Sequence, residues 1–263
     1  MSNDTLRILQ ISDIHLFADE KRSLLGVNTL ESFQAVMALV KAEKDVNLII
    51  LSGDLSQDGS DVAYKRIASL MEGLNVPVYY LPGNHDNVAM MAQVLPRQII
   101  SNHKHIVLKD WHIILLNSQK PGAVEGYLDE SELNYLQHCL QAYPEHRAII
   151  VFHHHPVKVG SKWLDNLGLT NADTFWNIIS HYPRVHTVLY GHVHQVKEEL
   201  VGNIHCLSAP ACCFQFKCQN EFALDYLPPG YRWLEFYPDG RIKTGIKRTA
   251  NYVGTFDEQA KGY

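Results

Sequence analysis

Short hydrophobic runs alternate with amphipathic segments along the first two thirds of the chain. Each run is rich in Ile, Val, Leu or Tyr and is bounded by turn residues, a pattern that predicts a β-strand. Strands are expected at residues 7–11, 48–51, 78–81, 112–116, 148–152 and 187–190. Because helical patterns separate these runs, the sequence favours an α/β layered fold with largely buried strands.

The helical patterns have recognisable start signals. Asn28 is followed by Glu31 in the spacing of a capping box, and the apolar residues that follow fall on one helical face. Further helices are expected at residues 62–71 and 130–140. From about Leu200 the pattern changes to strands and loops, which predicts an antiparallel tail with strands at 231–237 and 241–246. No linker or internal repeat is visible, so a single domain over residues 1–263 is expected.

Composition narrows the class of protein. Hydrophobic residues make up 46% of the chain and charged residues 19%, which is ordinary for a globular protein. The net charge of -5 argues against broad, non-specific nucleic-acid binding. No apolar run is long enough to span a bilayer. The first residues include the acidic Asp4 and lack the apolar stretch of a signal peptide.

These features together favour a cytoplasmic enzyme with neither a membrane nor a nucleic-acid partner. The five cysteines include no C-x-x-C pair, so reduced and mostly buried thiols are expected rather than a zinc site. The oligomeric state is left open by the sequence.

Polar residues suited to metal binding follow five of the predicted strands. The segments are Asp13-Ile14-His15, Gly53-Asp54, Gly83-Asn84-His85-Asp86, His153-His154-His155-Pro156 and Gly191-His192-Val193-His194. In open α/β sheets ligands bind beyond the carboxyl ends of the strands, so one convergent site is expected. A lone histidine would more simply be structural. The mixed nitrogen and oxygen set, with glycines that let the backbone turn sharply, predicts a pair of Fe, Mn or Zn ions.

The ordered motifs D-x-H, G-D, G-N-H-D, H-x-P and G-H-x-H resemble those of the calcineurin-type metallophosphoesterase superfamily. The segments LLGVNT (24–29), HHHPVKVGSKWLDN (153–166), YGHVHQ (190–195) and FQFK (214–217) further resemble the bacterial 3′,5′-cyclic AMP phosphodiesterases of that superfamily. This resemblance covers nearly the whole chain. It implies a four-layer αββα sandwich in which two mixed sheets are flanked by helices.

The resemblance also implies two metal ions, with Fe or Mn favoured and Zn compatible. One ion would be held by Asp13, His15, Asp54 and His194, and the other by Asp54, Asn84, His154 and His192, with Asp54 bridging the two. His154 occupies the H-x-P position, whereas His153 and His155 stay open between packing and a role beside the site. Purple acid phosphatases carry a metal-bound tyrosine where this chain has Gln57, so that branch and its colour are not expected.

The expected chemistry is hydrolysis of 3′,5′-cyclic AMP to 5′-AMP. Two ions about 3.5–4 Å apart can generate a bridging hydroxide and clamp phosphoryl oxygens for in-line attack. His85, beside Asn84, is expected to protonate the leaving oxygen, and positioning of a metal ligand is its alternative role. Asn84, His85 and His194 are the expected substrate contacts at the phosphate.

The residues that would contact the base are less constrained by the motifs. Phe214 and Phe216 are candidates for stacking on a purine, and Gln215 or Asn220 for bonding its edge, with strand core as the alternative for the phenylalanines. Two other functions stay open. The same metal site would serve a phosphoesterase for phosphomonoesters, 2′,3′-cyclic nucleotides or another phosphodiester. A binding protein could keep the fold without catalysis, although it would be expected to lose metal ligands.

Overall fold

Two six-stranded sheets lie face to face in the computed structural model, which describes residues 5–250, 252–260 and 262. The first sheet contains, in spatial order, β16 (Ile242–Arg248), β15 (Gly230–Phe236), β1 (Leu6–Ile11), β4 (Leu48–Ser52), β5 (Val78–Leu81) and β6 (Ile100–Ser101). The second contains β11 (Glu198–Val201), β12 (Ile204–Ser208), β10 (Val185–Tyr190), β9 (Arg147–Val151), β8 (Trp111–Leu115) and β7 (His105–Leu108). Asp4, named above, lies outside the described residues.

Both sheets are mixed. In the first sheet β1, β4, β5 and β6 run parallel, whereas β15 pairs antiparallel with both β1 and β16. In the second sheet β8, β9, β10 and β12 run parallel, and β7 and β11 are antiparallel edge strands. Two small hairpins, β2 (Ser23–Leu24) with β3 (Val27–Asn28) and β13 (Gln215–Phe216) with β14 (Leu224–Asp225), lie apart from the main sheets.

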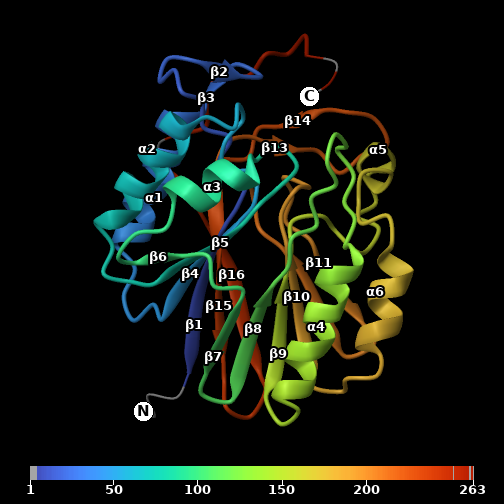
Figure 1. Ribbon diagram of the computed structural model, residues 1–263. Helices are drawn as coiled ribbons and strands as arrows, with labels where there is room; N and C mark the ends of the chain where they lie inside the picture. Colours follow the sequence, from blue (N-terminus) through green and yellow to red (C-terminus); the bar gives the residue numbers. More distant parts are fainter. Residues whose placement is uncertain (1–4, 251, 261, 263) are drawn as a thin grey trace.

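Helices cover the outer face of each sheet, so the expected four-layer αββα sandwich is confirmed (Figure 1). α1 (Thr29–Lys41), α2 (Asp61–Glu72) and α3 (Val88–Val94) cover the first sheet. α4 (Glu130–Ala142), the short α5 (Lys162–Asp165) and α6 (Ala172–Ile179) cover the second. Among the described residues, no helix is both long enough and apolar enough to cross a membrane.

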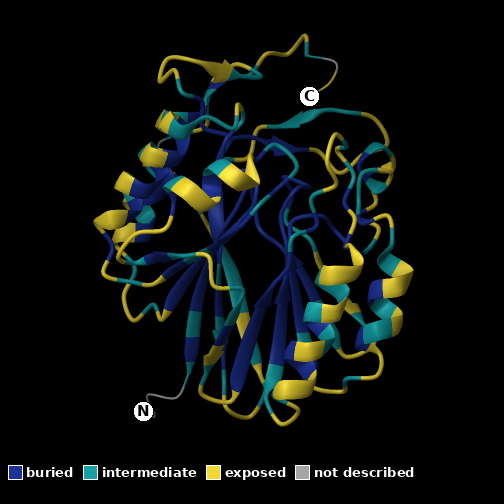
Figure 2. Ribbon diagram, in the orientation of Figure 1, coloured by how far each residue is buried: buried dark blue, intermediate teal, exposed yellow. Residues whose placement is uncertain are grey.

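The central strands are largely apolar on both faces because both of their faces are buried (Figure 2). In β4, Ile49 and Leu51 pack beneath the helices, while Leu48 and Ile50 point into the core between the two sheets. Successive side chains of a strand point to opposite faces, so a strand inside a sandwich needs a continuous apolar run rather than an alternating one. This is the pattern from which the six strands were predicted.

The helix predictions agree with the structure to within two residues at each end. The side chain of Asn28 caps α1 by accepting the backbone N–H of Glu31 at 3.0 Å, as the capping-box spacing predicts. The other two predicted helices correspond to α2 and α4. α3 and α6, which have seven and eight residues, were not predicted.

The prediction of a wholly antiparallel tail is wrong. β15 and β16 are antiparallel as expected, but β12 pairs parallel with β10. A tight turn containing Gly202, whose φ is 60°, joins β11 to β12, and β12 lies between β11 and β10. The chain therefore reverses twice before β12 and returns to the direction of β10. Strand patterning does not reveal which strand of a hairpin will pair with the existing sheet.

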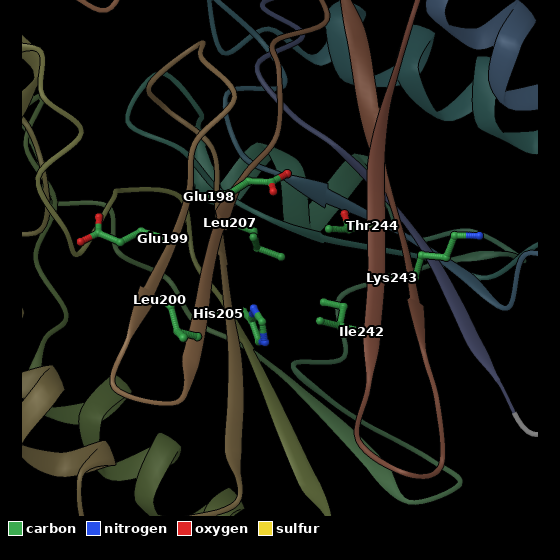
Figure 3. A pocket seen from close by; sticks show the side chains of 8 residues that line it. All are labelled: Glu198, Glu199, Leu200, His205, Leu207, Ile242, Lys243 and Thr244. Atoms are coloured by element: carbon green, nitrogen blue, oxygen red, sulfur yellow. The ribbon is translucent and has the colours of Figure 1, made fainter.

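The sandwich is open on one side, between the edge strands β11 and β16. A groove of about 470 Å³ runs there, with Leu207 and Ile242 on opposite sheets and with Glu198 and Lys243 on its two lips (Figure 3). None of the predicted site residues lines this groove. The candidate site lies elsewhere, beyond the carboxyl ends of the parallel strands.

Candidate metal centre

The predicted ligands lie in loops that follow parallel strands of both sheets. Asp13 and His15 follow β1, Asp54 follows β4, and Asn84 follows β5 in the first sheet. The three consecutive histidines follow β9, and His192 and His194 follow β10 in the second sheet. The two sheets face each other (Figure 1). The loops at the carboxyl ends of their parallel strands therefore bring these side chains together in one site.

Five of the predicted ligands have a left-handed backbone. The φ angles are 55° at Asp13, 53° at His15, 51° at Asp54, 67° at His192 and 46° at His194. Residues other than glycine seldom adopt this conformation, which costs free energy and persists only where the surrounding structure enforces it. Its recurrence at five residues of one cluster indicates a functional site.

The first half of the cluster joins Asp13, His15 and His194. Nε2 of His15 lies 3.2 Å from Nε2 of His194, and the latter atom lies 3.4 Å from Oδ1 of Asp13. Oδ2 of Asp54 lies 3.7 Å from Nε2 of His15. All four side chains are buried. These spacings suit donor atoms that face a common metal ion.

The second half of the cluster shares Asp54 with the first. Nε2 of His153 lies 3.1 Å from Oδ2 of Asp54 and 3.9 Å from Oδ1 of Asp13. Within the described part of the chain, Asn84 Oδ1 and His192 Nε2 are buried with no hydrogen-bond partner. Buried polar atoms are almost always satisfied, so these orphaned atoms fit a site that holds a metal ion.

The three consecutive histidines lie together at the cluster, and the ligand role expected of His154 stays a prediction. Ring nitrogens of His153, His154 and His192 come within 4.8 Å of one another. However, His154 Nε2 lies 3.0 Å from the carbonyl oxygen of Val124, and its Nδ1 lies 2.8 Å from the hydroxyl of Ser118. A carbonyl can only accept, so Nε2–H donates to it and Nδ1 accepts from the hydroxyl. In this arrangement His154 has no lone pair left for a metal ion.

The alternation of side chains beyond β9 explains why His153 faces the centre. Val151 points into the core between the sheets, and Phe152 points toward the helices. His153 therefore points inward again and His154 outward. The ring of His155 stacks beside that of His192, with centroids 5.9 Å apart.

Each inward-facing imidazole is held from behind by an oxygen acceptor. The Nδ1 atom of His153 lies 2.9 Å from the Ser52 carbonyl, and that of His194 lies 2.9 Å from the Phe214 carbonyl. The third imidazole, His15, uses the side chain of Gln57. These contacts place a proton on Nδ1 of each ring. In His15 and His194 the Nε2 lone pair is then directed inward, which is the form that binds metals. Nε2 of His153 faces the Asp54 carboxylate at 3.1 Å and would have to give up its proton to bind a metal ion.

Electrostatics of the cluster favour an ionised carboxylate beside imidazoles that differ in charge. Burial would lower the pKa of His153, but the charge and hydrogen bond of Asp54 outweigh it and raise that pKa to about 9. Burial lowers the pKa of His15 to about 3 and lowers the pKa of His192 well below its usual value. Burial alone would raise the pKa of Asp54, but the charge and hydrogen bond of His153 outweigh it and lower that pKa well below its ordinary range. The centre therefore offers lone pairs and negative charge, as metal ligands must.

His85 lies on the solvent side of the same cluster. A ring nitrogen of His85 lies within 4.8 Å of ligand atoms of His15 and Asp54, and its ring centroid is 5.1 Å from that of His15. The side chain is only partly buried. A role of His85 as proton donor stays a prediction.

Asp86 does not face His85. Its carboxylate accepts the backbone N–H groups of Gly83 at 2.9 Å, Leu55 at 3.1 Å and Ser56 at 3.0 Å, and the hydroxyl of Tyr64 at 3.0 Å. It therefore fastens the loop after β4 to the loop after β5.

Of the four residues considered for the base, three are enclosed by protein and Asn220 is exposed. Phe214 and Gln215 are 0% and 1% exposed. The Phe214 ring packs 5.0 Å from the ring of His194, and the Gln215 amide bonds to both backbone polar groups of Ala211. Phe216 is also buried and stacks 4.6 Å from His194. A contact between these side chains and a nucleotide stays a prediction, and it requires them to become exposed.

Sequence reasoning missed one residue that ties the site together. The amide nitrogen of Gln119 donates to the carbonyl oxygens of Gly83 at 2.8 Å and Asp86 at 2.7 Å. Gln119 lies in the loop after β8, so it links the second sheet to the loop that carries Asn84. No motif marks this residue, because its partners are backbone atoms far away in sequence.

The fold and the cluster match a known family. A model of the calcineurin-like phosphoesterases matches residues 6–196, and the chain belongs to this family. Among curated proteins, the chain is 40% identical to the 3′,5′-cyclic adenosine monophosphate phosphodiesterase CpdA of Vibrio vulnificus, covering 100% of this chain and 97% of that protein. It is 38% identical to CpdA of Escherichia coli K12, covering 98% and 95%.

Solved structures support the same architecture. A dimetal phosphatase from Danio rerio superposes with a TM-score of 0.65 at 13% identity, covering 93% of this chain and 99% of that one. At so low an identity the likeness concerns the fold alone.

Proposed function

We propose that this chain hydrolyses 3′,5′-cyclic AMP to 5′-AMP at the buried centre. The proposal rests on the cluster of buried imidazoles and carboxylates. Both halves of this cluster contact Asp54, and His85 lies on its solvent side. The curated relatives are similar over nearly their whole length and bear the name of this activity, which supports the choice of substrate.

We propose two transition-metal ions at this centre, with Fe or Mn favoured and Zn compatible. The first would be held by Asp13, His15, Asp54 and His194, and the second by Asp54, Asn84, His153 and His192. His153 takes the place expected of His154, because the two ring nitrogens of His154 are engaged elsewhere. When bound, such ions supply an activated water and offset the negative charge of a phosphoryl group.

The protein's own residues would then orient the substrate and handle the proton. The amide nitrogen of Asn84 would contact a phosphoryl oxygen. The contact also expected from His194 would lack a ring nitrogen, because Nδ1 faces the Phe214 carbonyl and Nε2 would bind the metal ion. His85 would donate a proton to O3′ of the ribose as the bond between phosphorus and O3′ breaks, because an alkoxide is a poor leaving group without a proton. The phosphate would stay on O5′, which makes 5′-AMP the product.

The test is chromatography of reactions run with purified, metal-replete protein. Cyclic AMP, cyclic GMP and 2′,3′-cyclic AMP are compared, with 5′-AMP expected from cyclic AMP. A main product of 3′-AMP would overturn the direction of cleavage. Good turnover of another ester with none of cyclic AMP would overturn the substrate and leave a phosphoesterase of the same family. The five free cysteines fit a cytoplasmic location, which cell fractionation would test.

A further inference from the structure

The loops after β1 and β4 are joined along their backbones. The N–H groups of Ile14 and His15 both donate to the Asp54 carbonyl at 2.9 Å, and Leu16 N–H donates to the Leu55 carbonyl at 3.0 Å. Gln57 N–H returns a bond to the Leu16 carbonyl at 2.9 Å. This ladder fixes Gln57 beside His15, so the contact between them is built into the fold.

The Gln57 side chain binds the face of His15 that points away from the centre. Its Oε1 atom lies 2.6 Å from Nδ1 of His15. An amide oxygen can only accept, so Nδ1 carries the proton and Nε2 keeps its lone pair. That lone pair points toward the atoms of His194 and Asp54 described above.

Of the imidazoles of His15, His153 and His194, that of His15 has a side-chain oxygen as the acceptor behind it. The partners of His153 and His194 are the carbonyls of Ser52 and Phe214, which a substitution cannot remove. An imidazole whose outer partner is a carboxylate donates more strongly to a metal ion than one bonded to a neutral oxygen. A glutamine at this position therefore gives a weaker donor than a glutamate would.

We propose that Gln57 is a positioning residue that fixes the tautomer and orientation of His15, and that its neutral amide sets the affinity of the metal ion shared by His15, Asp13 and His194. The inference rests on the proposed metal-dependent function. It gives a role to the residue that stands where purple acid phosphatases carry a metal-bound tyrosine. Gln57 would act on the ion through His15 rather than by binding it.

The experiment titrates metal-free protein with Mn²⁺ or Co²⁺ by calorimetry and records the visible absorption of the Co²⁺ form. Gln57→Met removes the acceptor at similar size, and we expect about 10- to 100-fold weaker binding of one of the two ions with a changed Co²⁺ spectrum. Gln57→Glu keeps the acceptor and adds charge, so binding of that ion should be tighter than in the wild type. Gln10→Met is the matched control, because the buried amide of Gln10 bonds Ser52 and Tyr190 and touches no imidazole.

Wild-type affinity for both ions and an unchanged Co²⁺ spectrum in Gln57→Met would overturn the inference. If Gln57→Met does not fold, Gln57→Glu decides the matter, and unchanged or weaker binding in that variant would overturn it. The readouts need no substrate. A wild-type protein that binds two ions but leaves cyclic AMP intact would therefore overturn the proposed substrate while the role of Gln57 is still decided by the titration.

Discussion

The backbone N–H of His85 donates to Oδ1 of Asp54 at 2.9 Å, so the proposed proton donor is hydrogen-bonded directly to the proposed bridging ligand. The other oxygen, Oδ2, faces the imidazoles of His153 and His15. The two oxygens of one carboxylate thus have different partners. One orders the loop that carries the proton donor, and the other belongs to the metal cluster.

We expect Asp54→Ala to abolish activity and to lower the content of both metals. The substitution removes the shared carboxylate and also frees the His85 loop. Metal analysis by mass spectrometry and turnover of cyclic AMP measure the effect, and circular dichroism checks that the fold is kept. Asp54→Asn separates the two roles, since it retains an acceptor for the His85 N–H without the charge. Wild-type turnover of Asp54→Ala with both metals bound would rule out a bridging role.

We expect His85→Ala to keep both metal ions and to lose roughly 10²- to 10⁴-fold in the rate of cyclic AMP hydrolysis. The loss should be smaller for a nitrophenyl phosphodiester, because its leaving group needs little protonation. The comparison of kcat on the two substrates measures this difference. Equal losses on both would mean that His85 positions another group and does not donate the proton.

The fold could be predicted because its central strands are buried on both faces and have no competing interpretation. Residues 48–51 are apolar throughout, and the structure places them between two layers. Elements that depend on partners elsewhere were not predictable. β6 has two residues, which pair with Val78 and Tyr79 of β5 in the sheet. So short a strand has no sequence pattern of its own from which it could be predicted.

The site could be predicted as a set, although not in its details. Asp13, Asp54 and His192 follow strand ends that the apolar runs locate, so their convergence follows from the fold class. Whether His153 or His154 binds a metal ion depends on which of the two side chains points toward the other ligands. The sequence cannot distinguish them, because three identical residues stand in a row. Phe214 was a candidate for stacking because of its residue type alone, which does not tell whether the ring is exposed.

Acid should destabilise the protein in part through His112, which lies at the start of β8, far from the metal cluster. Burial, followed by the charges of His105 and His146, lowers the pKa of His112 from 6.5 to about 4. Between these values the unfolded chain binds a proton that the folded chain does not, so stability falls as pH drops from 6.5 toward 4. His112→Gln should lose less stability over this range in urea unfolding. An identical pH dependence in the variant and the wild type would contradict this origin.

The two adjacent histidines after β9 should have opposite effects on metal content. We expect His153→Ala to lose one metal ion and nearly all activity, because its Nε2 faces Asp54 at 3.1 Å while Ser52 holds its Nδ1. We expect His154→Ala to keep both ions. This substitution should mainly lower the thermal stability, because the hydrogen bonds of His154 to Ser118 and Val124 hold the loop after β8.

Metal analysis and thermal unfolding of the two variants, prepared side by side, separate these expectations. Each variant is the control for the other, because both remove a buried imidazole from the same segment. The two side chains have different partners: Nε2 of His153 faces Asp54 at 3.1 Å, whereas the ring nitrogens of His154 face Ser118 and Val124. Loss of a metal ion from His154→Ala, with both ions retained in His153→Ala, would show that His154 and not His153 is the ligand.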